Sequence, residues 1–401
     1  MYYTMKQKIH PTKAQIAFFE RCIDNQRFYY NQGLSLWTRL YEAGETKLSG
    51  RKIRNELHTR IKNNTLCDKD GVVYEDLSFL DSPANILDSA CEHLDRAWKN
   101  FFRKGIKEGY AKNRPIYKCR KTASKSFTIG KKNDGTFKYD ENTFSFTKCP
   151  GAIRIKEALR FIDIFDDIKT ISISNDSYGW YISITYTLTS NPFNTHQKPF
   201  DKVGVDLGIK DFAVLSAVDD TNTPIKVNID KKVKGKLLKL SIHLKRMQRV
   251  LAKKRLSNPE WKLSKRYELL KTKIAHTYQQ IAYIKKEFLH TLTYDLTETF
   301  NHICIEDLQV KNMLKNRKLS RMIHESLWST FRVLLEYKAL RKNVSITLAD
   351  KFFPSSKTCS GCGNKKLDLT LSMRVYKCVS CNLSIDRDYN AALNLENLIS
   401  T

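Results

Sequence analysis

Four cysteines near the C-terminal end of the sequence constrain the fold more than any other feature. They form two Cys-x-x-Cys pairs separated by fifteen residues: Cys359, Cys362, Cys378 and Cys381. Two such pairs at this spacing are typical of a structural zinc site, in which four thiolates surround the ion and leave no open position for catalysis. Zinc binding of about 10–16 kcal/mol can fold a segment that has little apolar core of its own. The sequence therefore predicts a zinc ribbon over residues 356–381.

Three acidic residues interrupt apolar stretches in the second half of the chain. Asp206 and Glu306 each belong to an apolar, strand-like run, and Asp388 precedes a segment of small residues. Brought together, they would supply the anionic oxygens that Mg²⁺ prefers, and two Mg²⁺ ions about 3.5–4 Å apart can support phosphodiester hydrolysis. A local salt bridge or a helix cap is the alternative for each acid. Asp307 is expected on the opposite strand face from Glu306, because successive side chains of a strand alternate.

Two neighbouring aspartates, Asp386 and Asp388, are candidates for the third acidic ligand. Asp386 lies two residues before Asp388 and has three possible roles: a metal ligand, a group behind the ligands, or a helix cap. We favour Asp388 as the ligand, because Asn390 and Ala391 begin a small-residue helical face that would let the helix backbone approach a sheet. Arg387, between the two acids, is expected either to contact a phosphate or to pair with a neighbouring carboxylate.

The chain is strongly basic. Its 401 residues include 70 lysines and arginines against 42 aspartates and glutamates, a formal net charge of +28. Such an excess favours nucleic acid as a partner, through phosphate contacts and counterion release. Residues 231–290 hold 18 basic and 3 acidic residues and are predicted to form two antiparallel helices broken near Asn258-Pro259. We interpret this basic hairpin, about 231–299, as facing nucleic acid; a solvated charged surface is the alternative.

No membrane or secretory signal is recognisable. The longest apolar runs fall short of the roughly 18 residues that a transmembrane helix needs, and Met1 leads directly into a basic segment. A cytoplasmic protein without membrane contact is expected. In that compartment the ten cysteines argue against a disulfide framework.

Hydrophobic periodicity divides the N-terminal half into a helical part and a β-rich part. Residues 13–109 are predicted to be helical, with Pro83 at the start of a helix whose core face carries Leu87, Leu94 and Phe101. One strand is expected within residues 1–12. Six more are expected at 126–129, 136–139, 143–146, 152–155, 168–174 and 180–188. Short strands in this number favour a small β-barrel or sandwich.

Three segments resemble the split RuvC motifs of TnpB, the family of RNA-guided nucleases encoded in bacterial and archaeal insertion sequences and related to type V CRISPR effectors. They are Val205-Asp206-Leu-Gly-Ile209, Ile305-Glu306-Asp-Leu308 and Asp386-Arg-Asp388-Tyr-Asn390-Ala-Ala. The run Phe353–Gly363 resembles the start of the family's zinc ribbon. The likeness is closest from residue 203 onward and loosest over 105–190.

The resemblance implies a multidomain α+β fold. An N-terminal helical bundle and a β-barrel wedge domain would precede an RNase H-like RuvC α/β domain with an inserted helical hairpin and a four-cysteine zinc ribbon. The implied parts are a wedge domain (1–12 and 110–195), a helical recognition domain (13–109), a RuvC nuclease domain (196–355 and 382–401) and a ribbon that binds target nucleic acid (356–381). Asp206, Glu306 and Asp388 match the catalytic triad of the family by position.

The resemblance also implies an activity. A guide RNA transcribed from a transposon end would direct a monomeric ribonucleoprotein to double-stranded DNA beside a short target-adjacent motif. One RuvC site holding two Mg²⁺ ions would then cleave that DNA, in the prokaryotic cytoplasm. Three alternatives stay open: a compact type V CRISPR effector, a guide-directed repressor that binds DNA without cutting it, and a transposase that joins strands itself.

Overall fold

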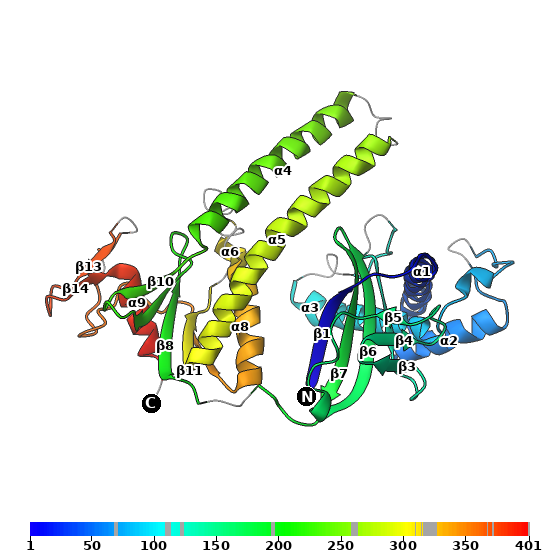
Figure 1. The fold of residues 1–401 in the computed structure, drawn as a ribbon, viewed down its shortest axis with the longest axis horizontal. Coiled ribbons are helices and arrows are strands. Elements are labelled where there is room, and N and C mark those ends of the chain that lie inside the picture. The colour runs from blue at the N-terminus through cyan, green and yellow to red at the C-terminus, as the bar shows by residue number, and fades with distance from the viewer. Residues whose placement is uncertain are drawn as a thin grey trace. The chain divides into compact units, whose positions relative to one another are not determined.

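The computed structural model describes residues 1–67, 71–108, 114–120, 124–193, 197–257, 264–308, 310–313, 315, 327–366, 368–370 and 373–399. The chain divides into two units, Met1–Ser190 and Asn191–Thr401, and each is described by itself (Figure 1). In the described helices, no stretch is both long and apolar enough to cross a lipid bilayer. The finer division into four domains stays a prediction.

An antiparallel four-stranded sheet organises the first unit. Its order is β1 (Tyr2–Ile9), β7 (Gly179–Leu188), β6 (Phe165–Asp176) and β2 (Ser126–Gly130). Buried residues alternate with exposed ones along β1 and with half-buried ones along β7, so one face of the sheet forms the core. Tyr3 pairs with Tyr186 on the buried face. The strands predicted within residues 1–12 and at 126–129, 168–174 and 180–188 are confirmed.

A second, three-stranded sheet contains β3 (Phe137–Asp140), β4 (Thr143–Phe146) and β5 (Ile153–Arg154), which confirms the other three predicted strands. The closed barrel is not formed in the part of the chain that the structure describes, because β1 and β2 are both edge strands of an open sheet. A helix covers the apolar face instead. Phe19 of that helix lies 5.9 Å from the Phe127 ring and 5.4 Å from the Trp180 ring. This helix buries the apolar face of the four-stranded sheet, which in a closed barrel would lie inside the barrel.

The helices of the first unit are α1 (Lys13–Glu42), α2 (Gly50–Lys62) and α3 (Asn85–Glu108), with short 3₁₀ turns at Ser78–Leu80 and Ile162–Ile164. Thr12 and Gln15 form a reciprocal capping box at the start of α1, which satisfies backbone N–H groups that the first turn leaves unpaired. The α3 helix begins two residues after Pro83, and its predicted core residues Leu87, Leu94 and Phe101 are buried. The region predicted to be helical thus contains three α-helices, and the described residues 63–67 and 71–84 between α2 and α3 form no α-helix.

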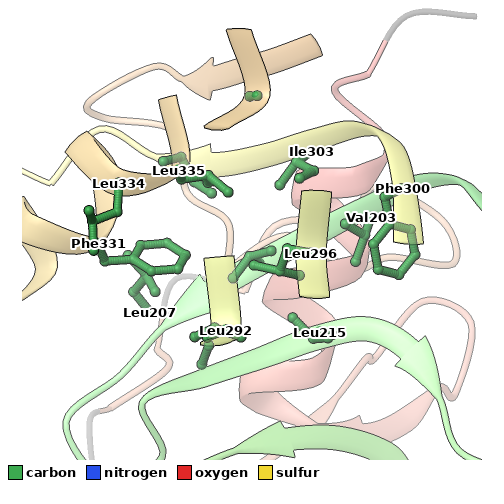
Figure 2. Close-up of a cluster of buried hydrophobic side chains, with 14 of the residues drawn as sticks. Val203, Leu207, Leu215, Leu292, Leu296, Phe300, Ile303, Phe331, Leu334 and Leu335 are labelled. Carbon is green, nitrogen blue, oxygen red and sulfur yellow. The ribbon is translucent and has the colours of Figure 1, made fainter. Parts of the chain in front are cut away.

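A mixed five-stranded sheet organises the second unit. Its order is β10 (Pro224–Val227), β9 (Ala213–Val218), β8 (Phe200–Leu207), β11 (Phe300–Glu306) and β12 (Ser345–Ala349). The central strand β11 runs parallel to both β8 and β12. Helices α5 (Lys265–Thr299) and α8 (Trp328–Lys342) pack on one face, where Leu296, Phe331 and Leu335 meet Val203 and Ile303 of the strands (Figure 2).

The predicted basic hairpin is confirmed as a helical element. Helix α4 (Lys231–Ser257) lies along α5 and contacts it, and the pair extends away from the sheet (Figure 1). Leu244 and Met247 are buried in α4, while its lysines and arginines are exposed. The predicted break near Asn258-Pro259 lies outside the described residues. A one-turn helix, α6 (Val310–Met313), follows β11.

The other face of the sheet is covered by α9 (Arg387–Glu396). Gly204 of β8 lies directly under this helix. A Cβ added at Gly204 would collide with the carbonyl oxygen of Ala392 and lie 2.5 Å from the backbone nitrogen of Glu396. The helix backbone therefore touches the strand backbone, as the small residues around Ala391 predicted.

Replacing Gly204 by alanine is expected to destabilise the second unit by about 3 kcal/mol, because neither backbone segment can yield to the added methyl group. The matched control is Gly235→Ala in exposed helix α4, where an added Cβ meets no atom within 4 Å. The free energy of unfolding of this control should rise by about 0.5–1 kcal/mol, since alanine has a higher helix propensity than glycine. Thermal unfolding of both variants measures the difference. A wild-type melting temperature for Gly204→Ala would contradict the close packing of α9.

Candidate active site

Parallel pairing of β8 and β11 brings two of the predicted acids side by side. Val205 pairs with Ile305, so Asp206 and Glu306 occupy the next position on each strand, at the carboxyl edge of the sheet. Val205 and Ile305 belong to the core beneath α5 and α8. Alternation along the strands then directs Asp206 and Glu306 to the opposite face, the one that α9 covers.

The first turn of α9 carries Asp388, and Asp386 caps that helix. Oδ1 of Asp386 accepts hydrogen bonds from the backbone N–H groups of Asp388 (2.9 Å) and Tyr389 (3.1 Å), and Oδ2 accepts one from Nζ of Lys226 (2.7 Å). Burial acts to raise the pKa of Asp386, but these hydrogen bonds and the Lys226 charge lower it below its usual range. The carboxylate of Asp386 is therefore used as a helix cap and ion-pair partner.

The pKa of Asp206 depends on both of the other predicted acids. Burial raises the pKa of Asp206 well above its usual range, and the carboxylates of Glu306 and Asp388 raise it further. Burial also raises the pKa of Glu306, against the opposing effect of a hydrogen bond from Ser355. Like charges in a poorly hydrated place repel one another, and a bound cation would offset that repulsion.

Two arginines contact Asp388. Arg387 donates from Nε (3.0 Å) and Nη2 (2.8 Å) to Oδ1 of Asp388, and from Nη1 to the carbonyl of Met373 (3.1 Å). Nη1 of Arg374 lies 3.7 Å from Oδ2 of Asp388. Of the two roles predicted for Arg387, pairing with a neighbouring acid is confirmed.

Asp307 points away from this centre, as predicted. Its carboxylate pairs with Arg332 of α8, on the face opposite Glu306. Asp307 therefore does not join Asp206, Glu306 and Asp388, although it is the direct neighbour of Glu306 in the sequence.

The carboxylate centre suits a hard divalent cation by its chemistry. Carboxylate oxygens are the donors that Mg²⁺ prefers, and burial, followed by the charges of Glu306 and Asp388, raises the pKa of Asp206. The three acids are more widely spaced than the cysteines: within the described ranges, only the cysteines form a group of three or more possible ligands with all donor atoms within 4.8 Å. The roles of Asp206, Glu306 and Asp388 as ligands stay a prediction.

The four cysteines form a closed cluster. Sγ of Cys359 lies 3.6 Å from Sγ of Cys381, and the sulfurs of Cys362 and Cys378 are also 3.6 Å apart. Zn–S bonds of about 2.3 Å in a tetrahedron would separate the sulfurs by about 3.8 Å. The cluster therefore fits one zinc ion. Gly363 adopts φ of +75° in the turn after the first pair, a conformation that glycine allows at little cost.

The cysteine module is a small β-hairpin with its own core. Strands β13 (Val375–Lys377) and β14 (Ser384–Asp386) pair antiparallel, and Tyr376 is buried beside Cys359 and Cys378. The Tyr376 hydroxyl donates to the carbonyls of Lys357 (3.3 Å) and Asn364 (3.2 Å). Apart from these few side chains the module has little apolar core, so the metal is expected to dominate its stability.

Two buried asparagines of α9 attach the module to that helix. Asn390 accepts from the backbone N–H of Ser360 (2.9 Å) and donates to the carbonyl of Thr358 (2.7 Å). Asn394 donates to the carbonyls of Ser355 (2.8 Å) and Thr358 (2.6 Å). The loop that leads to the first cysteine pair is thus held along the helix that carries Asp388.

Three residues of this site have roles that sequence reasoning missed: Ser355, Asn394 and Lys226. The Ser355 hydroxyl donates to Oε1 of Glu306 at 2.6 Å. Asn394 lies one helical turn after Asn390, and this spacing was the one signal that could have identified it. Lys226 lies on the short edge strand β10 and carries no local signal, because its partner Asp386 is 160 residues away.

Comparison with sequence families covers both units. The family described as "Probable transposase" matches residues 183–317, and the one described as "Cas12f1-like, TNB domain" matches residues 328–395. A third family, described as "Helix-turn-helix domain", matches residues 1–46, which in this chain form β1 and the long helix α1.

Relatives match almost the whole chain. A protein of Streptomyces pristinaespiralis named "Putative RNA-guided DNA endonuclease" is 30% identical over 97% of this chain and 87% of its own length. The "TnpB-like protein L79" of Acanthamoeba polyphaga mimivirus is 24% identical over 97% of this chain and 72% of its own length. A solved Cas12f1-sgRNA-target DNA complex aligns over 99% of both chains, with 16% identity and a TM-score of 0.34.

Proposed function

Because the chain belongs to the TnpB family of RNA-guided DNA endonucleases, we propose that it uses a guide RNA to select double-stranded DNA and cleaves that DNA at one RuvC-type carboxylate centre. The observation that carries this proposal is the convergence of Asp206, Glu306 and Asp388 on one face of the sheet. In finer detail, we propose a guide transcribed from a transposon end and a short target-adjacent motif in the DNA.

We assign binding of divalent metal to Asp206, Glu306 and Asp388. Two Mg²⁺ ions would supply water activation and stabilisation of the leaving oxygen in an in-line displacement. The chain's own contribution is to bury Asp206 and Glu306 side by side, with the charge of Asp388 near enough to raise the pKa of Asp206, so that their repulsion favours cation binding. Lys226 and Asp386 hold the first turn of α9 in position beside them.

We assign contact with the nucleic-acid backbone to the basic hairpin of α4 and α5. Nearly all of its described lysines and arginines up to His290 are exposed, and only Glu268 and Glu287 oppose them over that range. Tyr278 and Tyr283 expose 51% and 40% of their surface on α5, and aromatic rings beside cations suit single-stranded segments, because bases stack on them. Charge of this kind binds phosphate without reading sequence.

Sequence selection is then left to base pairing. Replacing a DNA duplex by an RNA–DNA duplex is nearly balanced in free energy, with each step worth on the order of 1.4 kcal/mol, so mismatches rather than protein contacts set specificity. We expect the protein to act as a monomeric ribonucleoprotein in the cytoplasm.

Expression with flanking genomic DNA, purification, and sequencing of bound RNA tests the proposal. The same preparation is then incubated with Mg²⁺ and a plasmid library that carries the guide-matched target beside randomised flanks. We expect a discrete bound RNA, and cuts confined to targets that share one flanking motif. The reaction without Mg²⁺ is the control.

Two results would contradict the proposal. Bound RNA with specific retention of target DNA but no cuts would indicate a guide-directed repressor. The absence of any discrete bound RNA would remove the guide from the mechanism.

A further inference from the structure

The loop between β12 and the first cysteine pair makes a direct hydrogen bond to one acid of the carboxylate centre. Ser355 lies in this loop and donates from Oγ to Oε1 of Glu306 at 2.6 Å. A hydroxyl–carboxylate hydrogen bond of this length is charge-assisted and strong. It fixes one oxygen of Glu306 and leaves the other available.

Ser355 is buried, and both its backbone N–H and its carbonyl form hydrogen bonds. The residue is only 5% exposed. Its backbone N–H donates to the carbonyl of Phe353 (2.9 Å), and its own carbonyl accepts from Asn394 (2.8 Å). The hydroxyl therefore projects from a fixed backbone, and its direction toward Glu306 is set by the loop rather than by free rotation of a surface side chain.

The same loop is fastened beside the cysteine cluster. Both Asn390 and Asn394 donate to the carbonyl of Thr358, and Ser360 donates to Asn390 (2.9 Å). Thr358 and Ser360 flank Cys359, one of the four clustered thiols. The segment that carries Ser355 thus runs directly into the first cysteine pair, and both are fastened to α9 by the same two asparagines.

The other end of the module makes a parallel contact. Arg387 bridges the carbonyl of Met373, next to β13, to the carboxylate of Asp388. Ser355, before the module in the sequence, therefore contacts Glu306, and Arg387, directly after the module, contacts Asp388.

We propose that Ser355 is a positioning residue for Glu306, and that the zinc-loaded cysteine module, through the loop that carries Ser355, sets the affinity of the carboxylate centre for divalent metal. This inference rests on the proposed function of that centre. It gives the module a role inside the nuclease site, in addition to any contact with nucleic acid.

Binding of Mn²⁺ to the full chain, freed of nucleic acid and loaded with zinc, tests the inference directly. Free Mn²⁺ is followed by electron paramagnetic resonance, and the sites that Asp206→Ala removes are counted. We expect Ser355→Ala to weaken this binding about tenfold or more, as loss of a hydrogen bond behind a metal ligand commonly does. Ser355→Thr, which keeps the hydroxyl, should restore binding to within about twofold of wild type.

The adjacent serine provides a matched control. Ser356 is only partly buried and makes no hydrogen bond to a carboxylate within the described residues. Ser356→Ala should bind Mn²⁺ like wild type, and the variants of Ser355 and Ser356 should each keep one zinc per chain. Wild-type Mn²⁺ affinity in Ser355→Ala would overturn the inference.

A double-mutant cycle tests the link to zinc. Cys378→Ser should weaken Mn²⁺ binding at least as much as Ser355→Ala does, and the double variant should bind no more weakly than Cys378→Ser, because both changes act through one loop. Fully additive losses would overturn the link. If the wild-type chain itself shows no Mn²⁺ site that Asp206→Ala removes, the proposed function of the centre fails instead.

Discussion

Replacing Glu306 by glutamine is expected to lower the rate of DNA cleavage by about a thousandfold or more, with guide RNA and target DNA still bound as in wild type. Glutamine keeps the shape of the side chain and can still accept the hydrogen bond from Ser355. It removes the negative charge that would hold a divalent cation. Metal ions contribute several kcal/mol to stabilisation of a phosphoryl transition state, and each 1.4 kcal/mol is a factor of about ten in rate. Single-turnover cleavage with saturating Mg²⁺ measures the loss.

The neighbouring acid is the control for this variant. Asp307→Asn removes a carboxylate one residue away, but that carboxylate faces α8 and pairs with Arg332. Its cleavage rate should stay within about threefold of wild type, since the nearest effect is the loss of one partly exposed ion pair. Equal losses in the two variants would show that proximity in the sequence, rather than the face of the strand, decides the effect. Unchanged cleavage in Glu306→Gln would remove Glu306 from the catalytic centre.

Replacing Cys378 by serine is expected to abolish zinc binding and to unfold the cysteine module. Zinc contributes about 10–16 kcal/mol to domains of this kind, and the core around Tyr376 is too small to replace it. Metal analysis should give one zinc per chain for wild type and none for the variant. Hydrogen exchange should show loss of protection in β13 and β14, with the first unit unaffected.

Cys119→Ser is the matched substitution outside the cluster. Cys119 is exposed and belongs to the first unit. This variant should keep one zinc and wild-type exchange behaviour throughout. Retention of stoichiometric zinc by Cys378→Ser would mean that the four thiols are not the zinc ligands, and wild-type protein purified without chelator but lacking zinc would lead to the same conclusion.

Local patterns account for most of the secondary structure. Alternation of apolar residues identified the strands near 168–174 and 180–188, and helical spacing identified the core face at Leu87 and Leu94. Both periods arise from backbone geometry over a few residues, so they can be identified without tertiary information. The prediction of a closed barrel was wrong because closure is not a local property. Whether a sheet closes depends on what covers its apolar face, and here Phe19 of α1 packs on that face.

The residues alone were enough to mark four cysteines by their spacing, three acids by their apolar surroundings, and a basic hairpin by its charge. They also predicted that Asp307 would face away from Glu306. Which acid would cap α9 stayed open until Lys226 and the backbone N–H groups were seen on Asp386. Ser355 and Glu306 are 49 residues apart, and no local pattern links them. Contacts of that kind depend on strand register and on the backbone approach of α9 to Gly204, and only the folded chain brings those together.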